Sequence, residues 1–490
     1  MRWIGVLVLG CQGANGDGST DTDTDTDTDA DTDTDTDTDT VSGNFSVRCA
    51  LAPDNVLRAS CAATFPSAQT LAVTLSLGTE APIAFTAEGP ATDAVLPVWG
   101  LSPDQTWRWE ASSVEDPSLF AEGTLTTPPL PGTLAGLIVA VDEGGAHGDE
   151  QVLFNYGCQS FAEALVVIDR MGRVRWYQEP SALPITPAPT SFRSLNVTPE
   201  GDVLALVERD SVVRWKFDGT VPLLLTRNVD FDAPLHHEVT RKNGLTYFLF
   251  AESVIVEGTA FVADGFYVFD DLGNQLGAWH MADSILPVEG GAAGGGYWTE
   301  DFPGAVDWSH SNALAVDDDL TVTVSLRFQD ALIRVVGDPA AVDFGRVEWI
   351  VVGDDDSALT TTVPYTSTAG IAEIGFADQH HVRSGGPGEL TLWDNHDDPA
   401  AGSRAMRFVA TDTSLDLVEE WPVGSFCPGQ GSATVLSSGN VLVDCAPNDT
   451  LAEVSPAGET VWSAQMSCGL GLMIRPLYRG LPIDLFPAVP

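Results

Sequence analysis

Lysine is almost missing from this sequence, which has only Lys216 and Lys242 beside twenty arginines in 490 residues. Basic residues of both kinds are few, since 22 Lys and Arg face 70 Asp and Glu and give a formal net charge of −48. Binding to nucleic acid or to anionic lipid needs a basic stripe, and none is visible here. The chain is therefore not expected to bind nucleic acid, and a small anionic substrate needs a local cluster of arginine and histidine.

No two cysteines have the C-x-x-C spacing, which argues against a zinc ribbon and against a thioredoxin-type redox site. Once Cys11 is set aside, six cysteines remain, an even number that suits disulfides in an oxidising compartment. The spacings favour two pairs on neighbouring strands and one between the ends of the large domain: Cys49–Cys61, Cys427–Cys445 and Cys158–Cys468. Six cysteines allow fifteen pairings, so other connections stay open.

Apolar runs long enough to span a membrane are also missing. Residues 1–11 carry Arg2 before a short apolar stretch, and Val8-Leu9-Gly10-Cys11 resembles a bacterial lipobox, in which the cysteine is acylated. We expect an exported cell-envelope lipoprotein attached to the membrane through Cys11, with a plain cleaved signal or a stray apolar start as alternatives. Residues 12–41, rich in alternating Asp and Thr, have almost nothing to bury and are expected to form a disordered linker.

The rest of the chain is too long for one ordinary core, and 47 Gly and 31 Pro favour short strands joined by tight turns. Residues 42–130 alternate polar and apolar side chains in strand fashion, for example at 71–77. The segment 101–109 resembles the corner of a fibronectin type III domain. We therefore expect a small fibronectin III/Ig-like β-sandwich over residues 42–130.

A drifting repeat fills residues 135–490, with a turn, two strands, and then a turn and a strand that ends in Trp. Five closing strands end at Trp176, Trp279, Trp349, Trp421 and Trp462, and a version without Trp lies at 218–225. Radial repetition of small antiparallel sheets removes exposed edges from an all-β chain of this length. The sequence predicts an all-β fold with a six-bladed β-propeller, five or seven blades being the alternatives.

Five of the eight histidines stand at equivalent places in this repeat, just before a strand that should start near the central axis. They lie in the segments 236–239, 307–312 and 378–382. Three different blades would thus deliver imidazoles to one central channel.

These segments carry a family resemblance. Residues 307–312 (Asp-Trp-Ser-His-Ser-Asn), continued by 324–333, resemble the signature of the bacterial aryl sulfotransferases, which move a sulfuryl group from an aryl sulfate without a nucleotide donor. Further matches are His237-Glu238, Gln379-His380, 390–395 and Ser403-Arg404. The resemblance covers roughly residues 135–480 and implies a six-bladed propeller behind a small β-sandwich.

The resemblance also assigns roles to residues. It implies that His380 is the nucleophile that becomes transiently sulfated. It implies that His237, His310 and Arg327 bind the sulfuryl oxygens and handle the proton of the phenolic oxygen. Further substrate-binding residues are expected at Asn312, His236, His381 and Arg404. An aryl sulfate and a phenol are the implied small-molecule partners, with neither a cofactor nor a metal, and a homodimer is left open.

Two positions depart from the family pattern, namely Phe328, where a histidine is common, and His381, where a smaller or acidic residue is usual. The chemistry itself suits the residues: sulfuryl transfer, like phosphoryl transfer, passes through a loose transition state, so positioning and cationic donors dominate. A neutral imidazole is a good nucleophile, and a planar guanidinium suits an oxyanion. The alternatives are a non-catalytic, surface-displayed propeller that binds sulfated or other ligands, a quinone-cofactor dehydrogenase, and a metal site, which arginine disfavours.

Overall fold

The computed structural model describes residues 45–490 except 133, 159–162, 288–290, 292–295, 355–356, 470–476 and 487–490. All of these belong to one compact unit, Asp39–Pro490. The expected signal segment (1–11) and linker (12–41) lie outside the described residues. The described residues form β-strands and short 3₁₀ turns, so the fold is all-β as predicted. None of their helices is long and apolar enough to cross a membrane.

Residues 46–126 form two sheets. The first has the order β1 (Ser46–Ala52), β2 (Asn55–Gln69), β5 (Ala91–Val98), and the second β4 (Ile83–Thr86), β3 (Leu71–Ser76), β6 (Thr106–Ser113), β7 (Phe120–Thr126). Burial alternates along β3 and β6, where Trp107 and Trp109 point to the interior. Cys49 and Cys61 stand opposite each other in the β1–β2 register and form a disulfide.

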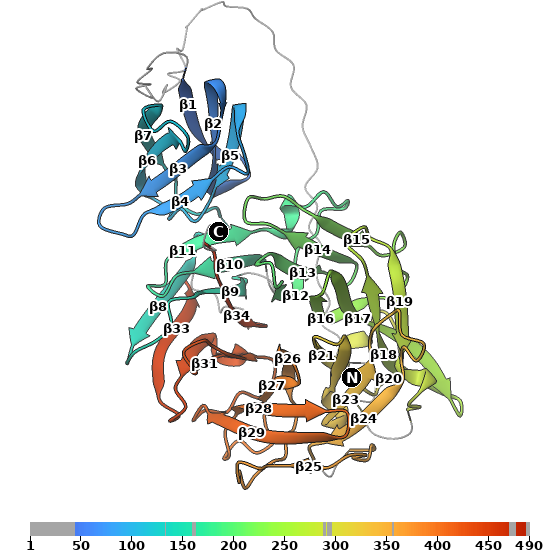
Figure 1. Cartoon of the computed structure of the whole chain (residues 1–490). Coiled ribbons are helices and arrows are strands. Elements are labelled where there is room, and N and C mark those ends of the chain that lie inside the picture. The colour runs from blue at the N-terminus through green and yellow to red at the C-terminus, as the bar shows by residue number, and fades with distance from the viewer. Residues whose placement is uncertain are drawn as a thin grey trace, which may run out of the picture. The chain divides into compact units, whose positions relative to one another are not determined.

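Six further sheets follow between residues 137 and 483, and Figure 1 shows them arranged around a common centre, which is a propeller-like arrangement. The first sheet contains β9 (Gln151–Tyr156), β10 (Ala164–Ile168), β11 (Val174–Gln178) and β34 (Gly480–Ile483). The second contains β12 (Phe192–Val197), β13 (Val203–Val207), β14 (Ser211–Trp215) and β15 (Leu223–Thr226). The third contains β16 (Leu235–Lys242), β17 (Leu245–Val256), β18 (Thr259–Phe269) and β19 (Gln275–His280), with β20 (Val306–Asp307) beside β18.

The other three are β21 (Ser311–Val316), β22 (Thr321–Leu326), β23 (Ala331–Val336), β24 (Val347–Val352); β26 (His380–Gly386), β27 (Glu389–Asp394), β28 (Arg404–Thr411), β29 (Ser414–Pro422), β25 (Tyr365–Thr366); and β30 (Ser432–Val435), β31 (Val441–Cys445), β32 (Thr450–Val454), β33 (Thr460–Cys468), β8 (Leu137–Glu143). The strands β12, β16, β21 and β26 each form one edge of their sheet and pack against one another. They lie towards the centre in Figure 1, and we call them the inner strands.

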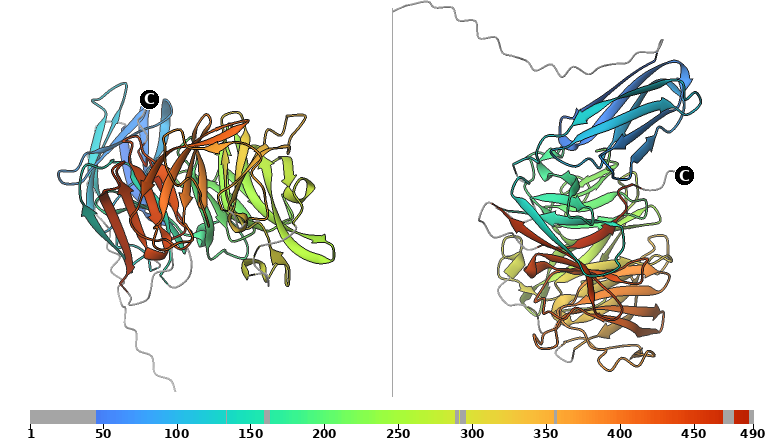
Figure 2. Two further views of the ribbon diagram at one scale, coloured as in Figure 1. Left: turned by 90° about the horizontal axis from the view of Figure 1, so that it is seen from below. Right: turned by 90° about the vertical axis from the view of Figure 1, so that its left-hand side faces the viewer.

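Strand exchange closes the ring of sheets. The last strand, β34, joins the first sheet beside β9, whereas the first strand of this region, β8, joins the last sheet beside β33. Cys158 and Cys468 form a disulfide that joins the same two sheets, and Cys427 pairs with Cys445. All three predicted cysteine pairs are therefore confirmed. Figure 2 shows the sheets from two further directions.

The tryptophans that end the repeats are buried in the fourth strand of their sheets. Three of them link neighbouring sheets, because their indole N–H donates to a backbone carbonyl there: Trp279 to Gly345 O at 3.0 Å, Trp349 to Thr411 O at 2.9 Å and Trp462 to Arg170 O at 2.9 Å. The repeat read from the sequence is thus the repeat of sheets in the structure.

Candidate active site

Each inner strand has a register shift near its start. The shifts lie at residues 192–194 of β12, 235–239 of β16, 311–313 of β21 and 380–383 of β26. A β-bulge of this kind inserts extra residues into one strand and re-aims their side chains. Arg193 and the histidines at 236–237 and 381 lie within these bulges, so the bulges decide which way these side chains point.

The backbone is left-handed at three of the candidate histidines. The φ angle is +54° at His237, +44° at His310 and +49° at His381. A residue with a Cβ in this conformation costs about 1–3 kcal/mol and persists only where its surroundings hold it. Two of these residues, His237 and His310, have their rings side by side in the site described next, whereas His381 lies outside it.

The four residues expected to act in catalysis converge. The imidazole rings of His237 and His310 have their centroids 4.9 Å apart. Burial lowers the pKa of His380, and the charge of Arg327 lowers it further. Burial also lowers the pKa of His237 well below its ordinary range, with further contributions from neighbouring His310, His380 and Arg327. Three imidazoles and one guanidinium from three sheets therefore share one site.

His380 is held in a defined tautomer. Its Nδ1 lies 2.6 Å from Asn395 Oδ1 and 2.9 Å from the carbonyl oxygen of Asp378, and both of these atoms are acceptors. Nδ1 therefore carries the proton, and Nε2 keeps its lone pair and accepts the backbone N–H of Gln430 at 3.3 Å. Burial lowers the pKa of His380 to about 3, so the ring is neutral at physiological pH.

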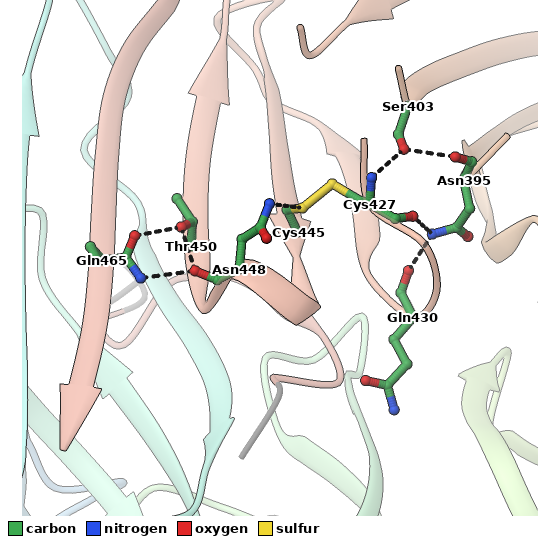
Figure 3. The surroundings of a disulfide bond; sticks show 8 residues. All are labelled: Asn395, Ser403, Cys427, Gln430, Cys445, Asn448, Thr450 and Gln465. Atoms are coloured by element: carbon green, nitrogen blue, oxygen red, sulfur yellow. Dashed lines mark hydrogen bonds between the residues drawn. A yellow bond between two sulfur atoms is a disulfide. The ribbon is translucent and has the colours of Figure 1, made fainter. Parts of the chain in front are cut away.

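A disulfide supports this arrangement (Figure 3). The Asn395 amide donates to the carbonyls of Cys427 at 2.7 Å and of Gln430 at 2.9 Å, which fixes its Oδ1 towards His380. Ser403 Oγ donates to the Asn395 carbonyl at 2.7 Å and accepts the Cys427 N–H at 2.8 Å. Because Cys427 is bonded to Cys445 of β31, the loop that holds Asn395 is tied to the sixth sheet.

Buried carboxylates orient the other two histidine positions. Asp307 Oδ2 lies 2.6 Å from His310 Nδ1, which leaves Nε2 of His310 for a substrate. Asp264 accepts the Ser309 hydroxyl and the Ser311 N–H, each at 2.6 Å, and contacts His236 Nε2 at 3.2 Å. The segment around His310 is thus fixed from both sides.

Arg327 is anchored through one edge of its guanidinium. Its Nε donates to Asp378 Oδ1 at 2.9 Å, and Asp378 is its carboxylate partner among the described residues. The side chain is 26% exposed, and its guanidinium lies 5.4 Å from the ring of Phe328. An arginine held through Nε keeps its terminal nitrogens for a second oxyanion.

A cavity of about 220 Å³ adjoins His237 and contains residues that the sequence motifs missed. Its other lining residues are Arg193, Tyr297, Gln430 and Tyr478. The Tyr478 hydroxyl donates to the carbonyl of His237 at 2.8 Å, and the Tyr297 ring lies 5.0 Å from that of His237. Arg193 Nε is buried without a hydrogen-bond partner among the described residues. Neither tyrosine belongs to the histidine motifs, so no motif in the sequence pointed to them.

The four residues expected to bind substrate lie elsewhere. His236 is buried behind His237, with its Nδ1 2.9 Å from that of His237. Asn312 is buried and donates to the carbonyl of Gln379 at 2.6 Å. Arg404 is engaged by Asp394 at 3.0 Å and Glu420 at 2.8 Å.

His381 lines a different cavity, at the far ends of the inner strands. None of these four residues lines the cavity beside His237. Their assigned roles stay predictions. Within the described part of the chain, no group of three or more His, Cys, Asp or Glu side chains is arranged to hold a metal ion.

Comparison with known proteins gives one family. A family model described as Arylsulfotransferase (ASST) matches residues 142–414. No curated protein matches the chain.

Solved structures resemble the chain only distantly. A protein of unknown function from Bacteroides caccae has 10% identity, a TM-score of 0.39, and coverage of 68% of this chain and 99% of that one. A streptogramin B lyase has 11% identity, a TM-score of 0.37 and coverage of 69% and 97%. A virginiamycin B lyase from Staphylococcus aureus has 10% identity, a TM-score of 0.33, and coverage of 66% of this chain and 88% of that one.

Proposed function

The chain belongs to the arylsulfotransferase family, and on this premise we propose that it moves a sulfuryl group from an aryl sulfate ester to a phenolic acceptor through a sulfohistidine at His380. Family membership supports aryl sulfotransferase activity in general. The observation that carries the finer proposal is that Asn395 Oδ1 and the Asp378 carbonyl hold the proton on Nδ1 of His380, so that the lone pair lies on Nε2, where its partner is the long contact of 3.3 Å from the Gln430 N–H. Such an imidazole can attack sulfur without first losing a proton.

In the first half-reaction, Nε2 of His380 forms a bond to the sulfur as the bond between sulfur and the aryl oxygen breaks. Charge is spread over three sulfuryl oxygens, which Arg327 and His237 are placed to receive. The phenolic oxygen leaves with the electron pair of the broken bond. His310, hydrogen-bonded to buried Asp307, supplies its proton, and the carboxylate stabilises the ring in the charged form.

In the second half-reaction, the oxygen of an acceptor phenol attacks the same sulfur and the bond from nitrogen to sulfur breaks. The proton of the acceptor passes to His310, which is thereby ready for the next donor. His380 returns to its starting form, since its Nδ1 proton stays with Asn395 and Asp378 throughout. The cycle is balanced: one sulfuryl group and one proton are exchanged between two phenols.

The proposal is tested by kinetics with a chromogenic aryl sulfate and an added phenol. Phenol-dependent release of the chromophore with parallel lines in a double-reciprocal plot is expected. After incubation with donor alone, the intact mass should rise by one sulfuryl group. His380→Ala should lack this addition, whereas His280→Ala should retain it, because His280 pairs with Glu252 outside the site. A wild type that turns over but is never modified, or that shows no phenol dependence, overturns the proposal.

We also infer the finer architecture. The six sheets of residues 135–490 are the blades of a six-bladed propeller, and the two sheets of residues 42–130 form a fibronectin III/Ig-like sandwich. Support comes from the strand exchange between the first and last sheets and from the alternating burial in β3 and β6.

Localisation follows in part from the cysteines. Three disulfides fit an oxidising compartment, so the chain is exported. We propose in addition that Cys11 carries a lipid and that residues 12–41 are the tether. The wild type should then partition into detergent and Cys11→Ala into the aqueous phase; equal partitioning of the two contradicts the anchor.

A further inference from the structure

A second cavity lies at the far ends of the inner strands. It measures about 250 Å³, and its lining includes Thr198, Glu238, Thr240, Arg241, His381 and Arg383. Arg383 follows His380 by three positions on the same strand, which is about 10 Å along it. We call this the distal cavity, because the cavity beside His237 shares no lining residue with it.

Arg383 is unusual among the arginines of this chain. Among those that the structure describes, all but three have a carboxylate within ion-pair distance, and the exceptions are Arg48, Arg193 and Arg383. Arg48 is exposed to solvent. Arg383 is partly buried, and one terminal nitrogen is buried without a hydrogen-bond partner among the described residues.

An arginine cannot escape burial by losing its proton at physiological pH. Burial lowers the pKa of Arg383, and the charge of Arg479 lowers it further, but the ordinary value is so high that the side chain stays charged. An unpaired buried charge is strongly destabilising unless a counter-charge or water satisfies it. Arg383 therefore lacks a counter-charge in direct contact among the described residues, although the charge of Glu238 acts on it from a distance.

The protein supplies no spare carboxylate there. Glu238 lines the distal cavity, but both of its oxygens contact Arg479, each at 2.8 Å, and this pair is buried. Arg241 and Lys242 add positive charge to the lining, and their carboxylate partners stand half-exposed at the surface. Of the charged side chains that line the cavity, Arg241, Lys242 and Arg383 are cationic and Glu238 is anionic, and Arg383 is the cation among them that has no carboxylate partner among the described residues.

We propose that the distal cavity binds one small tetrahedral oxyanion, sulfate or phosphate, on the guanidinium of Arg383. The planar fork of an arginine matches two oxygens of such an ion. The hydroxyl of Thr198 already accepts the Asp202 N–H at 3.1 Å, so its own proton is available, and Thr240 offers a second hydroxyl in the lining. This site is independent of sulfuryl transfer at His380 and stands whether or not that function holds.

Calorimetry on the full chain tests the proposal, with Arg327→Ala as background so that sulfate cannot use the catalytic arginine. Sodium sulfate and sodium phosphate are titrated separately at constant ionic strength, which also reveals which ion is preferred. A saturable site that Arg383→Met weakens is expected, whereas any binding at Arg193, which also lacks a carboxylate partner among the described residues, should be removed by Arg193→Met instead. Arg383→Met added to this background keeps the apolar stem but removes the charge, and should weaken binding by about 10- to 100-fold. Arg193→Met, the matched change beside His237, should leave this site unchanged.

A structural measurement on the unaltered protein covers the case in which a variant fails to fold. Crystals of the wild type soaked in selenate should give an anomalous peak beside the Arg383 guanidinium. No peak there, no saturable binding in Arg327→Ala, or undiminished binding after Arg383→Met would each overturn the site and leave water as the partner of Arg383.

Discussion

The two ends of the inner strands are built from neighbouring residues but differ in kind. At the catalytic end, His237, His310 and His380 are neutral or carboxylate-bound imidazoles around one anchored arginine. At the distal end, His381 and Glu238, one position further along, line a cavity with an unpaired arginine. The bulges in β16 and β26 lie at these positions, and residues adjacent in the chain thus have different surroundings.

The two ends differ in how their polar side chains are held: hydrogen bonds orient the imidazoles at one end, and an ion pair holds Glu238 at the other. At the end that holds the proposed active site, an acceptor at Nδ1 sets the tautomer of His310 and of His380. At the distal end, Glu238 is taken up by a buried ion pair with Arg479. The proposed transfer of a sulfuryl group needs a nitrogen with a lone pair, Nε2 of His380. The oxyanion proposed at the distal end needs only the charge of Arg383.

The largest expected effect comes from substituting two adjacent histidines, His380 and His381, one at a time. His380→Ala should lower kcat by at least about 10³-fold, since it removes the proposed nucleophile. His381→Ala should lower kcat less than about 10-fold and reduce the melting temperature, because His381 is buried and its ring lines the distal cavity. Steady-state kinetics with a chromogenic aryl sulfate measure both. Equal losses of kcat would mean that His381 also belongs to the reaction.

The next effect tests the tautomer. Asn395→Ala removes the acceptor 2.6 Å from Nδ1 of His380 and the donor to the loop at Cys427. We expect kcat to fall by about 10²-fold with little change in KM, because positioning rather than substrate binding is lost. Asn196→Ala is the matched control, since its amide bonds Glu238 and the Val239 carbonyl. A rise in KM at unchanged kcat would contradict the role given to Asn395.

Much of this arrangement could be predicted from the sequence, but not all. The repeat predicted the sheets because a turn and a closing strand recur in each one, with a tryptophan in five of the six, and the cysteine spacings predicted the disulfides. The histidine motifs predicted His237, His310 and His380 as one cluster, and these rings do converge.

The sequence assigned different roles to His380 and His381, but it could not show that His381 lines the distal cavity. In a regular strand, neighbouring side chains point to opposite faces of the sheet. A bulge changes this alternation and re-aims the side chains of its residues. Its position depends on register with the next strand, which a single sequence does not show. The sequence analysis missed Arg193 and Tyr478 for a related reason. They reach the site through contacts between residues far apart in the chain, such as the hydrogen bond from Tyr478 to the His237 carbonyl.

A smaller effect concerns the disulfides. Cys427→Ser combined with Cys445→Ser should lower stability by about 3 kcal/mol and also reduce kcat by about 10-fold, because the loop that holds Asn395 loosens. Cys49→Ser combined with Cys61→Ser, in the β1–β2 pair, should reduce stability with kcat unchanged. Denaturant titrations and kinetics on both double variants compare the two. Full activity without the Cys427–Cys445 bond would show that Asn395 keeps its place unaided.

The smallest effect concerns charge at the catalytic end. Asp330 accepts the N–H of Asp378 at 2.7 Å, and burial, with the nearby charge of Asp378, raises its pKa to about 7. The folded protein therefore holds a proton there that the unfolded chain has lost, so this carboxyl makes folding less favourable as the pH rises from about 4 to 7. Asp330→Asn keeps the acceptor without the charge. Its stability should exceed that of the wild type by roughly 1–3 kcal/mol at pH 8, after allowance for its partial exposure, with a gap that narrows towards pH 4. Urea titrations across this range measure the gap, and a gap independent of pH would show that folding does not raise the pKa of Asp330.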